Sequence, residues 1–81
     1  MSNYGHSTRD IAFRCDKFSE RVDELIERNG LTVSGFAPSI GYERKAVYRW
    51  RDNATIPSAD AIFTICCVYG VDANWLLGLE A

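Results

Sequence analysis

Apolar residues recur at steps of three and four along the first third of the chain, which is the pattern of an amphipathic helix. This stripe consists of Ile11, Cys15, Phe18, Val22, Leu25 and Ile26. Asn29-Gly30 follows it, and both residues tolerate the left-handed backbone that ends a helix. The pattern predicts either one helix over about residues 8–28 or a shorter helix after a break near Asp16.

Two short helices joined by a sharp turn are predicted in the middle of the chain. Thr32 is a good cap for a helix over about residues 32–39. Pro38 is a poor residue inside a helix, so this helix should be short and distorted at its end. Gly41 provides the turn, and residues 43–51 form the next helix.

Two further helices are predicted in the last third. Ser58 caps the first of them, which ends at Gly70. Its expected buried stripe is Ile62, Ile65, Cys66 and Tyr69. Asp72 caps a short helix over about residues 73–79. Because the alternation typical of strands is missing from the sequence, we expect an all-α fold with five helices.

The size and composition of the chain indicate one domain. Its 81 residues, 47% of them hydrophobic, are enough for one compact core. We expect residues 1–8 to be a flexible tail and residues 9–81 to form the domain. No apolar run approaches the roughly 20 residues of a membrane span, and the N-terminus lacks the apolar region of a secretory signal. These features predict a cytoplasmic protein that does not associate with a membrane.

Cysteine and histidine usage gives no sign of a metal or cofactor. Three cysteines are an odd number without the spacing of a disulfide framework, and His6 is the single histidine. The separated Cys and His pairs of structural zinc sites are missing. No nucleophile has a base nearby in the pattern, and there is no glycine-rich phosphate loop. We therefore expect no cofactor, no metal and no enzymatic activity.

The formal net charge of −2 argues against nucleic-acid binding, because phosphates attract a basic surface. The distribution of charge changes this picture. Residues 42–55 contain four basic side chains and two acidic ones, so that the rest of the chain carries −4. A basic segment on an acidic body can turn one face toward a polyanion.

The basic segment divides into two faces when residues 44–51 are placed on a helical wheel. One face carries Arg44, Lys45, Tyr48 and Arg49, and the other carries Ala46, Val47 and Trp50. Arginine reads guanine through two parallel hydrogen bonds in the major groove of DNA. From this helix alone two interpretations stay open: a base-reading face or a solvated charged face.

The surrounding sequence favours the first interpretation. Ala37, Gly41 and Val47 have the spacing of a tight pair of helices. Four segments appear in order with fitting gaps: residues 31–41, 46–50, 56–58 and 70–78, the last containing Trp75-Leu76-Leu77-Gly78. Together they resemble the Cro/lambda-repressor-type helix-turn-helix family, especially the N-terminal domains of phage repressors, over about residues 17–78. The resemblance implies a compact five-helix bundle, DNA binding and regulation of transcription by repression.

The resemblance also implies roles for individual residues. The base-reading positions are Arg44, Lys45, Tyr48 and Arg49. The positions that contact phosphate are Thr32, Val33, Ser34, Asn53 and Thr55, and we add Arg51, at the border of the basic face, as a further candidate for such a contact. The core positions are Phe36, Ala37, Val47, Trp50, Ile62, Ile65, Cys66, Trp75 and Leu76. Family members usually bind as homodimers, and we assign the dimer or partner surface to Trp75, Leu76, Leu77 and Leu79. The implied partner is double-stranded DNA, which would place the protein at the nucleoid.

Three residues depart from the family pattern. Val33 stands where the family often has glutamine, so that only backbone N–H groups there can meet phosphate. Pro38 is unusual in the second helix, and Asp52 puts an acid near the expected phosphate surface. These departures favour an alternative function, in which the same fold is a protein-interaction module, such as an antirepressor or a partner-binding subunit, with weak or no DNA binding.

Overall fold

The computed structural model describes residues 15–52 and 54–79, and within these residues the chain is all-helical without strands. The helices are α1 (Cys15–Arg28), α2 (Val33–Ser39), α3 (Arg44–Arg51), α4 (Ala59–Tyr69) and α5 (Ala73–Leu77). The predicted all-α class with five helices is confirmed at this level. The predicted tail over residues 1–8 and the start of the first helix lie outside the described residues.

Side-chain caps set the beginnings of three helices, as predicted. Thr32, Ser58 and Asp72 each accept a hydrogen bond from the backbone N–H three residues later. Each of these bonds satisfies one of the N–H groups that a helix start leaves without a partner. Helix α3 differs, because Glu43 occupies its cap position without a side-chain hydrogen bond. The helix therefore begins one residue later than the predicted range of 43–51.

Helix α2 is short and ends tightly, as Pro38 led us to expect. The N–H groups of Ile40 and Gly41 donate to carbonyls three residues back, at 3.2 and 3.0 Å. The Ser39 hydroxyl donates to the Phe36 carbonyl at 2.6 Å. Gly41 then has φ 78°, a left-handed conformation that favours glycine, and the chain turns into α3.

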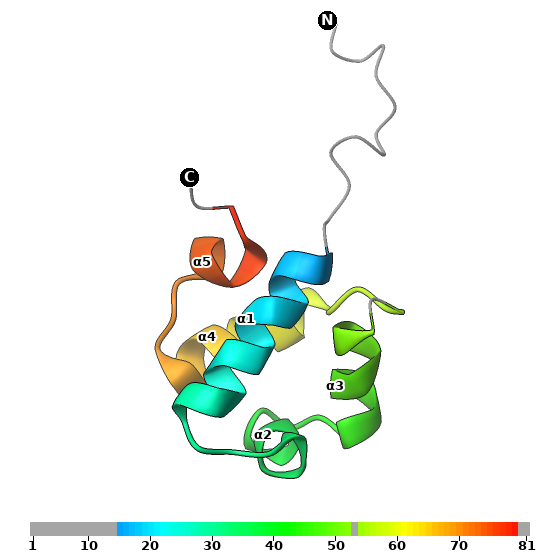
Figure 1. Cartoon of the computed structure of the whole chain (residues 1–81). Helices are drawn as coiled ribbons and strands as arrows, with labels where there is room; N and C mark the ends of the chain where they lie inside the picture. Colours follow the sequence, from blue (N-terminus) through cyan, green and yellow to red (C-terminus); the bar gives the residue numbers. More distant parts are fainter. Residues whose placement is uncertain (1–14, 53, 80–81) are drawn as a thin grey trace, which may run out of the picture.

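The core lies between α1 and the other four helices, which are arranged around α1 (Figure 1). It consists of Phe18, Val22, Leu25, Val33, Phe36, Ala37, Ile40, Val47, Trp50, Ala61, Ile65 and Leu76. Most core positions implied by the resemblance are confirmed as buried, whereas Ile62, Cys66 and Trp75 are only partly buried and pack against the core. The edge of the Phe18 ring meets Trp50 at 5.6 Å between centroids, which joins α1 to α3.

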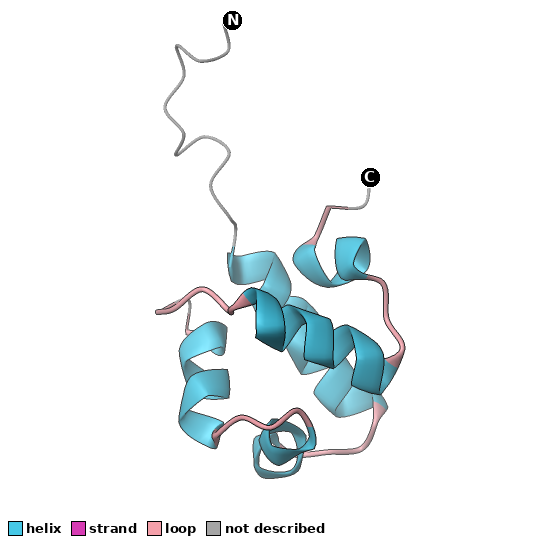
Figure 2. Ribbon diagram, turned by 180° about the vertical axis from the view of Figure 1, so that it is seen from behind, coloured by secondary structure: helices cyan, strands magenta, loops and turns pink. Residues whose placement is uncertain are grey.

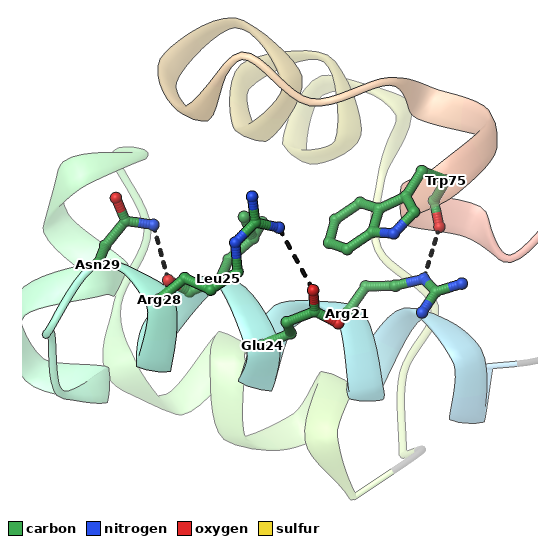
Figure 3. Close-up of polar contacts among 6 residues, drawn as sticks. All are labelled: Arg21, Glu24, Leu25, Arg28, Asn29 and Trp75. Carbon is green, nitrogen blue, oxygen red and sulfur yellow. Dashed lines mark hydrogen bonds and ion pairs between the residues drawn. The ribbon is translucent and has the colours of Figure 1, made fainter.

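Helix α5 is held against α1 by two arginines that flank one tryptophan (Figure 3). The Nε of Arg21 donates to the Trp75 carbonyl at 2.9 Å, and its guanidinium lies 4.9 Å from the centre of the indole ring. The guanidinium of Arg28 lies 5.8 Å from the same ring. Cations over an aromatic face are attracted by the ring. Trp75 therefore serves mainly to dock α5 within the chain.

Candidate nucleic-acid interface

Helix α3 has the two faces that the wheel predicted. Val47 is fully buried and Trp50 is 3% exposed, so that one side of the helix is part of the core. The Trp50 ring also lies 5.4 Å from the ring of Tyr42, which comes directly before the helix. These contacts fix the rotation of α3 about its axis and leave its other side at the surface (Figures 1 and 2).

The outward face of α3 carries four exposed side chains, which are Arg44, Lys45, Tyr48 and Arg49. Among the described residues, none of these three cations has an ion-pair partner. The one polar contact of this set is weak, because Nη1 of Arg44 lies 3.5 Å from the Ser34 hydroxyl. The predicted exposure of this face is confirmed, and the cations there are available to a ligand.

An open depression runs between α2 and α3 along this face. It is lined by Ser34, Pro38, Tyr42, Glu43, Arg44, Lys45, Tyr48, Arg49 and Asp52. Its three cations stand against two acids, so the local charge is only weakly positive. The depression is wide and shallow, which suits the edge of an extended ligand better than a small molecule.

The turn between α2 and α3 is tied to α4 by a contact that sequence reasoning missed. The Tyr42 hydroxyl lies 3.0 Å from the Ser58 hydroxyl and donates to the Asp60 carboxylate at 3.0 Å. Phe36 of α2 also stacks on Tyr69 of α4 with ring centres 5.3 Å apart. The sequence analysis interpreted Ser58 as a cap alone. These contacts hold α2 and the turn after it against α4.

Within residues 15–52 and 54–79, Arg51 is the one cation of α3 that has an ion-pair partner. Its Nε lies 2.7 Å from the Asp23 carboxylate on α1. The Ser19 hydroxyl, also on α1, donates to the Arg51 carbonyl at 3.1 Å. We call Ser19, Asp23 and Arg51 the α1–α3 clamp. The clamp anchors the C-terminal end of α3, and it engages a side chain that was predicted to contact phosphate.

The remaining predicted phosphate contacts have mixed positions. Ser34 is exposed beside Arg44, so the structure brings it to the same face as the base-reading set. Thr32 is exposed but its hydroxyl already caps α2. The Val33 side chain is 8% exposed and points into the core, which leaves only its backbone at the surface. Thr55 is half-buried, and Asn53 lies outside the described residues.

The predicted dimer surface is largely occupied within the chain. Leu76 is fully buried, so its assignment to an exposed surface is corrected: the side chain fills the core beneath α5. Trp75 is partly buried against α1, and Leu77 is also only partly exposed. Leu79 is 69% exposed. Of these four residues, Leu79 alone is fully at the surface.

Two classes of site find no support within the described residues. Residues 15–52 and 54–79 contain no cluster of three or more His, Cys, Asp or Glu side chains that could hold a metal ion. No helix in this part of the chain combines the length and the apolar character required to cross a membrane.

Burial raises the pKa of the Cys66 thiol, and the neighbouring Cys67 and Asp72 add to the effect.

Comparison with known proteins gives no match to a protein-family model, a curated protein or a solved structure.

Proposed function

We propose that this protein binds double-stranded DNA in a sequence-specific way, with α3 in the major groove, and represses transcription by occupying its site. The observation that carries the proposal is the outward face of α3. Arg44, Lys45 and Arg49 are exposed there and have no ion-pair partner among the described residues, while the opposite face of the same helix is part of the core. A rigid helix with cations on its free side meets the steric and chemical demands of the groove.

Each side chain has a distinct proposed role. Arg44 and Arg49 hydrogen-bond to guanine O6 and N7, which is the commonest specific contact of arginine in the major groove. Lys45 places its positively charged ammonium group against a base edge or a phosphate. Tyr48, whose side chain is 48% exposed, offers its ring to a thymine methyl group or its hydroxyl to a base. Ser34 lies near Arg44 and donates to the adjacent phosphate.

The clamp changes the role that we assign to Arg51. A guanidinium whose Nε is bound to Asp23 holds the end of α3 against α1. In the proposed function Arg51 therefore orients the base-reading face and adds little to the phosphate contacts.

The experiment that tests this function starts with the selection of bound duplexes from a random pool by the wild-type chain. Mobility shifts then compare the affinities of the wild-type chain and of the Arg44→Ala, Arg49→Ala double variant for the selected duplex. The loss of a bidentate contact costs about 1–3 kcal/mol, so each substitution should weaken binding by roughly 5- to 150-fold.

The control is the Lys17→Ala variant, which removes an exposed cation from α1 and leaves α3 and the arginines that hold α5 intact. We expect this control to bind the selected duplex nearly as well as the wild type. Equal binding by the α3 double variant and the control would refute the assignment of α3 as the recognition helix.

A second candidate function is supported by the acids of the same depression. Glu43 and Asp52 line it together with the cations, and the whole chain carries −2. Such a mixed surface also suits a protein partner. The dependence of binding affinity on salt concentration distinguishes the two functions. DNA binding should weaken steeply as the salt concentration rises, because phosphates that the protein binds release counterions. An apolar protein contact should respond little.

A further inference from the structure

Glu43 is the acid at the N-terminal end of the candidate interface, and its carboxylate is not engaged by the part of the chain that the structure describes. Glu43 occupies the cap position of α3 with φ −87° and ψ 156°, but its side chain makes no cap hydrogen bond. The cap residues of α2, α4 and α5 do make such a bond. The Glu43 side chain is exposed and has no ion-pair partner among the described residues.

The sequence of α3 also places no cation where Glu43 could pair with it along the helix. Residues three and four positions apart are neighbours on a helix surface. For Glu43 these are Ala46 and Val47, and Val47 is fully buried. The dipole of α3 favours a negative charge at this end of the helix, and it leaves both carboxylate oxygens free to accept hydrogen bonds.

Glu43 belongs to the same surface as the cations that we propose to read bases. A second open depression adjoins the one between α2 and α3, since the two share lining residues. Glu43, Lys45 and Arg49 line both depressions. A ligand that reaches these two cations therefore also meets the carboxylate.

The backbone at Glu43 is held in place by its neighbours. The hydroxyl of Tyr42 donates to the Asp60 carboxylate, and the Tyr42 ring lies 5.4 Å from the ring of Trp50. The Glu43 carbonyl accepts from the N–H of Ala46 at 3.0 Å. Because its backbone is fixed, Glu43 loses little freedom when its side chain binds, which favours a contact with one defined position on a ligand.

We propose that Glu43 is a specificity-determining residue, whose carboxylate accepts a hydrogen bond from the N4 amino group of one cytosine in the major groove. This inference rests on the proposed function. The N-terminal residues of the helix that enters the groove are those that contact base edges, and Glu43 directly precedes Arg44 at this end of α3.

The chemistry of the base edges selects cytosine. An ionised carboxylate only accepts hydrogen bonds. In the major groove guanine and thymine present acceptors, and adenine presents the acceptor N7 beside its amino group, whereas cytosine presents its amino group alone. The carboxylate of Glu43 is therefore attracted to cytosine and repelled by the acceptors of the other three bases.

The same carboxylate lowers the affinity for DNA of any sequence, because phosphates repel it. The acid thus exchanges general affinity for discrimination between bases. Glutamine at this position would remove the repulsion, and its amide can bond to N6 and N7 of adenine. The Glu43→Gln substitution should therefore change the preferred base from cytosine to adenine.

The test repeats the selection of bound duplexes from a random pool with the wild type, Glu43→Gln and Glu43→Ala. We expect one cytosine of the wild-type consensus to become adenine with Glu43→Gln and to lose its preference with Glu43→Ala. The other positions should stay the same. In mobility shifts, replacing this cytosine should weaken wild-type binding by about tenfold and leave binding by Glu43→Ala unchanged. Both variants should keep the helical circular dichroism spectrum, since the side chain makes no cap bond.

The matched control is Asp52→Asn, which removes the same charge from the other end of the same depression. It should bind unselected DNA more tightly, as the Glu43 variants do, but it should select the wild-type consensus. A consensus that is the same for the wild type and both Glu43 variants would overturn the role of Glu43, as would the same base change in Asp52→Asn. Either result would leave the proposed function in place. A wild-type chain that selects no consensus would overturn the proposed function, and this inference with it.

Discussion

The α1–α3 clamp allows a quantitative prediction about how α3 is held in place. The perturbation is a double-mutant cycle with Asp23→Ala and Arg51→Ala, which isolates the coupling between the two side chains from their separate effects on helix propensity. The N–O distance of 2.7 Å is short, but Arg51 is 35% exposed and Asp23 is 48% exposed. Partly solvated pairs of this kind contribute about 0.2–1 kcal/mol, and the short contact favours the upper end.

The assay is urea unfolding followed by tryptophan fluorescence, since Trp50 is 3% exposed and changes its surroundings on unfolding. We expect a coupling free energy of about 0.5–1 kcal/mol at low salt that decreases in 1 M NaCl by screening, roughly as the Debye length falls. The comparison cycle uses Lys17 and Glu20, whose charged atoms are 3.9 Å apart and whose side chains are 53% and 63% exposed. Its coupling should be close to zero.

DNA binding gives the same clamp a second and independent readout. A side chain that binds phosphate contributes about one unit to the slope of log K against log salt, and its removal reduces that slope. If Arg51 orients α3 through Asp23, Arg51→Ala should weaken binding and leave the slope unchanged. The reasoning is refuted by a coupling of zero in the cycle together with a smaller salt slope for Arg51→Ala, because Arg51 would then be a phosphate ligand.

Two further predictions concern the end of the chain. Leu76→Ala should lower the free energy of unfolding by about 2–5 kcal/mol, because it empties a fully buried site. The control, Leu79→Ala, should change this free energy by less than about 0.5 kcal/mol. Equal values for the two variants would contradict the docking of α5. Gly78→Ala should destabilise more than Gly30→Ala in the same unfolding assay. Both glycines have positive φ, but a Cβ at Gly78 would lie 2.6 Å from Cβ of Lys17, and a Cβ at Gly30 would meet nothing within 4 Å. A larger loss for Gly30→Ala would show that backbone conformation outweighs this contact.

Much of the local structure was predictable, because it depends on interactions between neighbours in the chain. Thr32, Ser58 and Asp72 cap their helices by bonding to amides three residues later, and such bonds are written in the sequence. The division of α3 into a buried and an exposed face was also predictable. A helical repeat places Val47 and Trp50 on one side, whatever the rest of the chain does.

The sequence by itself therefore determined where three of the helices begin, through their caps, and which side of α3 is apolar. Only the tertiary structure decided that Arg51 pairs with Asp23 and that Leu76 belongs to the core, since these contacts join residues far apart in the chain. The same holds for α4. Its pattern predicted a buried stripe of Ile62, Ile65, Cys66 and Tyr69, of which only Ile65 is fully buried. Because that helix is apolar on most sides, the packing of the neighbouring helices decides which side is buried, and it leaves Phe63 68% exposed.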